Sequence, residues 1–116
     1  MPLILFLASQ NLSAATPGAS PDQISAARKA MDTYRLCVAA YANRFIKTTA
    51  AANEIADAAI STCEKDEQDA EKLMQGVVGQ GVKPREIAEE VTTRVRRFVI
   101  ALVLEQRYPI HDQSSP

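Results

Sequence analysis

Hydrophobic positions recur along the chain at steps of three and four residues over three long segments, the spacing of helices with one apolar face. These segments are residues 21–47, 49–75 and 84–107. The β-branched content between Val91 and Val103 raises a strand alternative. However, this stretch lacks alternation at every second residue, and a period of about 3.6 residues is sustained instead. We therefore predict an all-α fold with three helices.

The helix starts carry their own signals. Ser20 is the expected N-cap of the first helix, Gln23 its capping-box partner three residues later, and Pro21 occupies the first helical position. Pro84 opens the third segment in the same way. The glycines between residues 76 and 81 are expected to end the second helix.

Each predicted helix has a row of positions expected to face the other two. These are Ile24, Ala27, Met31, Tyr34, Val38, Tyr41 and Phe45 in the first, Ala52, Ala56, Ala59, Cys63, Ala70, Leu73 and Val77 in the second, and Ile87, Val91, Val95, Phe98 and Leu102 in the third. Small residues in the first half of the second row should allow close approach to the first helix.

Cys37 and Cys63 are the only two cysteines, and they lie on either side of a turn near residue 50. In an antiparallel hairpin they would therefore lie level, so we predict a disulfide that staples the hairpin. Such a bridge would stabilise the fold by about 3 to 4 kcal/mol. The alternative is a pair of reduced, buried cysteines that act as small apolar side chains. A redox-active pair is disfavoured because the C-x-x-C spacing is absent.

Residues 1–15 resemble the end of a secretory signal peptide. An apolar stretch at residues 3–8 is followed by the small residues Ser13 and Ala15, although no Lys or Arg precedes it. The alternative is an apolar segment that docks on the domain. With a linker at residues 16–20, we expect a periplasmic or secreted protein. The mature chain has no apolar run near the ~20 residues that span a bilayer.

The bulk composition bounds the classes of function. The 116 residues suit one domain, residues 21–108, followed by a polar tail at 109–116. The formal net charge of -1 gives no overall attraction to nucleic acid. Three arginines between Arg94 and Arg97 are too small a basic cluster to predict nucleic-acid binding.

Motifs for catalysis and for cofactor binding are absent from the sequence. We find no G-x-S-x-G, no HExxH and no phosphate-binding glycine loop. His111 with two cysteines makes a poor zinc site. We therefore expect no catalytic residue, cofactor or metal ion, and a protein that is not an enzyme.

The third predicted helix contains seven successive apolar residues, from Phe98 to Leu104. When a surface helix has apolar residues on every side, those that do not face the other helices need another surface to shield them from water. We expect the interaction surface at Val99, Ile100, Val103 and Leu104, covered by the N-terminal segment, a second protomer or a target. The favoured interpretation is an exported binding protein, inhibitor-like, immunity-like or chaperone-like, or a homodimer. The alternative is a cytosolic helical regulatory protein that binds protein or nucleic acid with its cysteines reduced.

Overall fold

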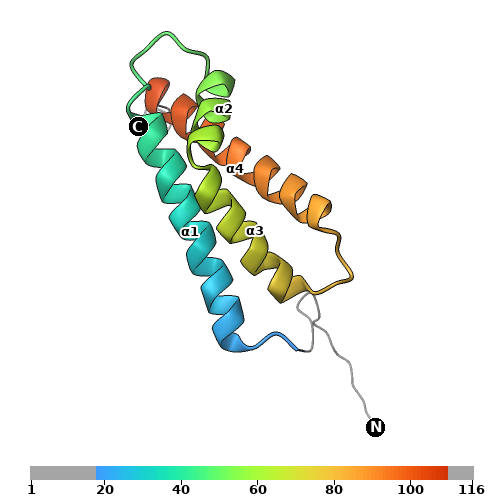
Figure 1. The fold of residues 1–116 in the computed structure, drawn as a ribbon. Helices are drawn as coiled ribbons and strands as arrows, with labels where there is room; N and C mark the ends of the chain where they lie inside the picture. Colours follow the sequence, from blue (N-terminus) through green and yellow to red (C-terminus); the bar gives the residue numbers. More distant parts are fainter. Residues whose placement is uncertain (1–17, 110–116) are drawn as a thin grey trace, which may run out of the picture.

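The computed structural model describes residues 18–109, and every regular element in that range is a helix. The helices are α1 (Pro21–Asn43), α2 (Ala52–Thr62), α3 (Glu64–Val78) and α4 (Pro84–Arg107). In Figure 1, α1 runs antiparallel to the α2–α3 pair, and α4 crosses them obliquely. The all-α class built on a helical hairpin is confirmed. The expected signal peptide at 1–15 and the tail from residue 110 lie outside the described residues.

The start of α1 has the predicted capping box. The Gln23 backbone N–H donates to Ser20 Oγ at 3.1 Å, and the Ser20 N–H donates to Gln23 Oε1 at 2.7 Å. The helix ends at Asn43, four residues before the predicted end at 47. The Thr48 hydroxyl donates to the Phe45 carbonyl at 2.6 Å, a local bond that competes with the helical ladder and favours a turn.

The single helix predicted at residues 49–75 is divided into α2 and α3 at Cys63. Cys63 has φ -98° and ψ 28°, outside the helical region. Its N–H still donates to the Ala59 carbonyl at 2.9 Å, and its carbonyl accepts from the Glu67 N–H at 3.1 Å. Bonds of helical spacing thus continue on both sides of Cys63, so α3 follows α2 as one slightly broken arm of the hairpin (Figure 1).

The end of α3 follows the glycine signal. Gly79 has φ 81°, in the left-handed region that glycine adopts without a steric penalty. Gln75 holds the following loop, because its Nε2 donates to the Gly79 carbonyl at 2.7 Å and to the Val82 carbonyl at 2.9 Å. The loop from α3 to α4 is therefore short and anchored.

The buried stripe of α4 repeats at every fourth residue and consists of Ile87, Val91, Val95, Val99 and Val103. Each such step turns about 40° around a helix, so the buried face rotates along α4. Rows at this spacing pack with helices crossing at a steep angle, which agrees with the oblique path of α4 in Figure 1. The prediction that Phe98 faces inward was wrong, because Phe98 is 36% exposed. Leu102 is half-buried and packs against the core, as predicted.

The core lies where these helices meet. From α1 it takes Ala27, Met31, Tyr34, Val38 and Ala42; from α2, α3 and the residue between them, Ile55, Ala56, Ala59, Cys63 and Ala70. Tyr34 is the largest side chain that is fully buried. Five alanines are buried in the same core, and close-packed interiors combine large and small residues in this way.

Candidate functional site

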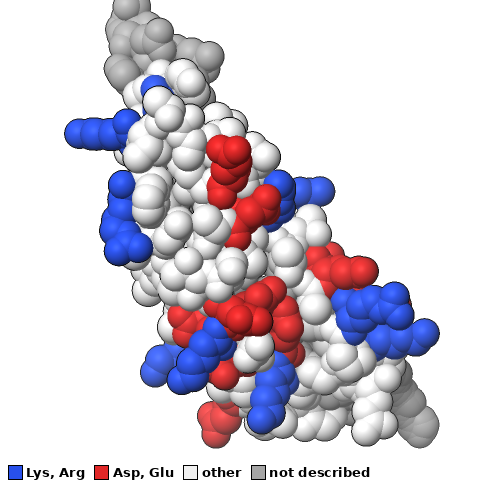
Figure 2. Space-filling view, turned by 45° about the horizontal axis from the view of Figure 1, so that its top comes forward, with Lys and Arg blue, Asp and Glu red and all other residues white. Residues whose placement is uncertain are grey.

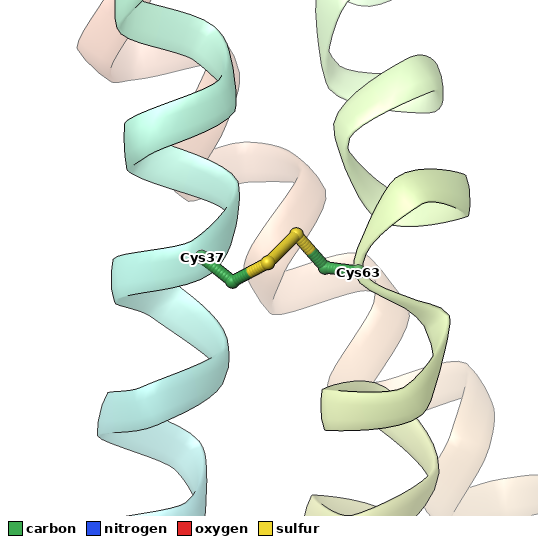
Figure 3. Close-up of a disulfide and its surroundings, with 2 residues drawn as sticks. All are labelled: Cys37 and Cys63. Atoms are coloured by element: carbon green, nitrogen blue, oxygen red, sulfur yellow. A yellow bond between two sulfur atoms is a disulfide. The ribbon is translucent and has the colours of Figure 1, made fainter.

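Cys37 and Cys63 form a disulfide that joins the middle of α1 to the break between α2 and α3 (Figure 3). The two sulfur atoms are 2.07 Å apart and the Cα atoms 6.1 Å apart. Cys63 is buried in the core and Cys37 is half-buried beside it. The bridge thus links the two arms of the hairpin.

The residues expected to form the interaction surface do not share one face. Val99 and Val103 are fully buried, at 0% exposure, because they belong to the inward stripe of α4. Ile100 is half-buried, and Leu104 is 44% exposed. Phe98 lies six residues before Leu104, about 120° away around the helix. The exposed apolar area that remains on this part of α4 is therefore scattered.

A groove of about 600 Å³ opens instead between α1, α3 and the first half of α4. Its apolar lining consists of Ile24, Ala27, Met31, Met74, Val77 and Val91. Its charged edges consist of Arg28, Asp32 and Arg35 on α1 and Glu90 and Arg94 on α4. We call this feature the three-helix groove.

The edges of the three-helix groove carry paired charges. Arg35 is ion-paired with Asp32 at 3.4 Å, and Arg94 with Glu90 one turn earlier on α4. All four side chains are substantially exposed, so each pair contributes at most ~1 kcal/mol to stability. Arg28 adds a third positive charge, which leaves the edges with a net positive charge. These side chains are free to exchange their present partners for those of a ligand.

A second hollow, of about 540 Å³, lies between α1 and α3 on their other side. Its lining includes the small residues Ala26, Ala30 and Thr33 and the exposed Leu73. Leu73 was predicted to face inward, but Met74 and Ala70 pack against the core and Leu73 is 40% exposed. Only two helices form this hollow, so it offers less contact to a ligand than the three-helix groove.

A polar cluster lies where α1, α3 and α4 meet. The Thr92 hydroxyl donates to Glu67 Oε2 at 2.9 Å, joining α4 to α3. Glu67 and Glu71 lie one helical turn apart on α3, so their carboxylates are neighbours on one helix face. The ring of Tyr34 is fully buried, and its hydroxyl has no hydrogen-bond partner among the described residues. We call these four residues the Glu67–Glu71 cluster.

Burial and mutual repulsion shift the acidity of this cluster. Partial burial, followed by the neighbouring Glu67 carboxylate, raises the pKa of Glu71 from 4.5 to about 7. The same two causes, burial first and then Glu67 and Glu71, raise the pKa of the Tyr34 hydroxyl. Glu71 therefore gains or loses a proton near neutral pH, whereas Tyr34 stays protonated.

The sequence patterns did not single out the Glu67–Glu71 cluster, because acidic residues on a helix are mostly exposed to solvent. A signal was nevertheless present. Continuing from Cys63 in steps of four and three leads to Glu67, Ala70 and Met74, which places a carboxylate on the inward face. An acidic residue on an inward row is a candidate for a perturbed pKa.

The surface charge is mixed. On the face shown in Figure 2, acidic side chains gather near the middle and basic side chains lie beside them, so no large field of one sign forms there. Within residues 18–109, no three His, Cys, Asp or Glu side chains are grouped as metal ligands would be. No helix in that range is both long and apolar enough to cross a membrane.

Comparison with known proteins gives no match to a protein-family model, to a curated protein or to a solved structure. Any assignment of function therefore rests on the groove, the cluster and the disulfide themselves.

Proposed function

We propose that the protein is an exported, non-enzymatic binding protein that holds an amphipathic helix of a partner protein in the three-helix groove. The observation that carries the proposal is the combination of an apolar floor with charged edges on both sides. Binding of a helix in a groove uses apolar anchors on one helix face and charges along the borders.

The composition of the floor suits a helical ligand. Met31 and Met74 lie in it, and methionine adapts its shape to different apolar partners. The α1 edge runs from Ile24 to Arg35, about 16 Å, which matches three turns of a helix. A ligand of two to three turns would cover the floor.

The charges of the edges indicate the kind of helix. Arg28, Arg35 and Arg94 outnumber Asp32 and Glu90. A partner helix with glutamates beside its apolar stripe would therefore meet complementary charge, which favours the correct orientation and speeds association.

Export is supported by the disulfide and by the resemblance of residues 1–15 to a signal peptide. Disulfides persist in oxidising compartments and are rare in the cytosol. Intact mass of the protein from its native host tests this: export predicts loss of about 15 residues and oxidised cysteines. An unprocessed, reduced chain would favour the cytosolic regulatory alternative.

Binding is tested with a labelled 14-residue peptide that carries leucines at steps of three and four, flanked by glutamates. We expect micromolar affinity by fluorescence anisotropy, and about tenfold weaker binding to the Val77→Glu variant, equivalent to about 1.4 kcal/mol. Leu73→Glu, one turn earlier on α3 and outside the groove, is the matched control and should bind within about twofold of wild type.

Two further peptides sharpen the test. One replaces the glutamates by lysines and should bind more weakly, because it meets the arginines of the edges. The other replaces the leucines by glutamines and should not bind. Equal binding of the peptide to wild type, Val77→Glu and Leu73→Glu would rule out the three-helix groove as the site.

A further inference from the structure

The hollow between α1 and α3 has an exposed leucine at each end. Leu73 lines the hollow itself and is 40% exposed. Leu36 follows Thr33 by one turn on α1 and is 72% exposed, the largest value among the large hydrophobic side chains of residues 18–109. A single exposed leucine is common on a protein surface, but two that flank one hollow form an apolar face that a partner can cover.

The disulfide sets how α1 and α3 line up along the hollow. Cys37 and Cys63 lie level, with Cα atoms 6.1 Å apart, and α1 runs antiparallel to α3 (Figure 1). Leu36 is next to the bridge, whereas Ala26 and Leu73 lie about 15 Å from it along the two arms. The face therefore has a protruding side chain at the disulfide end and the apolar walls of the hollow at the other end.

The charges that line the hollow are ordered along the same direction. Lys29 and Lys72 lie more than two helical turns from the disulfide. Asp66 lies within one turn of it, and Asp69 lies between these two levels. Among residues 18–109, none of these four side chains is ion-paired. The lining is thus positive at the end away from the bridge and negative toward it.

We propose that this face, the hollow together with Leu36, is the contact surface of a two-fold symmetric dimer of the chain. A second copy turned by 180° about an axis across the helices places its Leu36 over Ala26 and Leu73 of the first copy, where the hollow receives it. The same rotation places Lys72 of one copy opposite Asp66 of the other. In a two-fold dimer each contact is made twice, so one face supplies both the protrusion and the hollow.

The order of shapes and charges favours a second copy over an unrelated partner. Protrusion and hollow lie at opposite ends of one face, and so do the negative and positive charges, which lets the face complement itself. Of the four charges, Asp69 alone lies near the axis and meets its own copy. The face measures about 15 Å from Ala26 to Leu36, which is short for an interface, so we expect a weak dimer with a dissociation constant of roughly 10 to 100 µM.

This dimer does not depend on the proposed function. The three-helix groove lies on the opposite side of α1 and stays open when two copies meet through the hollow. The dimer carries two such grooves, and a partner with two acidic helices would gain avidity from binding both.

Sedimentation equilibrium of the full chain over a range of concentrations measures the dimer. Leu36→Glu should weaken dimerisation at least about tenfold, because it brings a charge to the apolar hollow. Leu104→Glu, at an exposed leucine on α4, is the matched control and should stay within about twofold of wild type. A wild-type chain that stays monomeric up to about 1 mM, or a Leu36→Glu variant that dimerises as wild type does, would overturn the proposal.

Charge reversal tests the two-fold arrangement. Lys72→Glu and Asp66→Lys should each weaken dimerisation several-fold, because each places like charges opposite each other. An equimolar mixture should dimerise more tightly than either variant alone, since in the mixed dimer the two reversed charges attract and the other pair keeps its wild-type charges. Lys47→Glu, at an exposed lysine outside the face, should have no effect, and Asp69→Asn should tighten the dimer. No gain in the mixture would overturn the arrangement.

Circular dichroism checks that each variant is folded, and Leu36→Glu decides the question if a charge variant is not. The acidic peptide then separates the dimer from the proposed function. Leu36→Glu should bind it within about twofold of wild type, because the three-helix groove is intact in the monomer. Dimerisation without peptide binding would keep the dimer and overturn the proposed function, and peptide binding by a chain that stays monomeric would do the reverse.

Discussion

Arg107, in the last turn of α4, donates from Nε to the carbonyl of Ile46 at 2.7 Å and so joins the end of α4 to the turn after α1. Its Nη2 also donates to the carbonyls of Phe45 at 3.3 Å and Thr48 at 2.9 Å. The early end of α1 leaves carbonyls without helical partners, and one guanidinium satisfies three of the acceptors in this turn.

We therefore predict that Arg107→Ala lowers the free energy of unfolding by about 1 to 3 kcal/mol, the range for hydrogen bonds from a charged donor. Arg107→Lys should recover only part of this, because an ammonium group lacks the planar fork. Urea unfolding measures both, with Arg97→Ala on the exposed side of α4 as control. An effect of Arg107→Ala no larger than that of Arg97→Ala would contradict this role.

Stability should fall as pH rises from about 5 to 8, because the pKa of Glu71 is raised to about 7 in the folded protein from 4.5. The folded state binds this proton more tightly than the unfolded state, so the contribution is complete below pH 4.5 and lost through pH 7. Because the Glu71 side chain is partly exposed, its contribution to the free energy of unfolding is on the order of 1 kcal/mol. The urea midpoint of wild type and of Glu71→Gln, measured across this pH range, isolates the contribution of Glu71. If the two midpoints changed in parallel with pH, Glu71 would not be the cause.

Reduction of the Cys37–Cys63 bridge should lower the free energy of unfolding by about 3 to 4 kcal/mol, because the bridge restricts the unfolded chain over a sequence separation of 26 residues. The measurement is urea unfolding with and without a reductant, and a Cys37→Ala, Cys63→Ala double variant serves as the reference that reductant cannot change. Unchanged wild-type stability under reduction would show that the bridge does not stabilise the hairpin.

The burial of Val99 predicts a contrast with Leu104 on the same helix. Val99→Ala should destabilise by about 2 kcal/mol, since it removes packed methyl groups from the core. Leu104→Ala should change stability by less than about 1 kcal/mol, because the side chain is 44% exposed. If the two variants were equally mild, Val99 would lie on the surface as the sequence pattern suggested.

The helices and the disulfide could be predicted because they depend on local signals. The Ser20 capping box, the proline at the start of α4 and the periodic apolar positions act within a few residues. The level position of Cys37 and Cys63 follows from the turn between them. The break at Cys63 has no comparable marker, since the sequence around it contains neither glycine nor proline.

The functional features could not be predicted because they depend on the angle between helices. The buried positions of α4 follow steps of four residues rather than alternating steps of three and four. Val99 and Val103 are therefore fully buried, whereas Phe98 is exposed. The same oblique crossing opens the three-helix groove and brings Thr92 to Glu67. Apolarity alone suggested Val99 to Leu104 as a surface, and it carried no information about that angle.

The measurement that tests the central claim most directly is an NMR titration of the isotope-labelled protein with the acidic amphipathic peptide, followed through methyl and amide signals. We predict the largest shifts at Met31, Met74 and Val77 in the floor of the three-helix groove, and small shifts at Ile100 and Leu104. Shifts concentrated at Ile100 and Leu104, or at Leu73 in the second hollow, would contradict the assignment of the binding site.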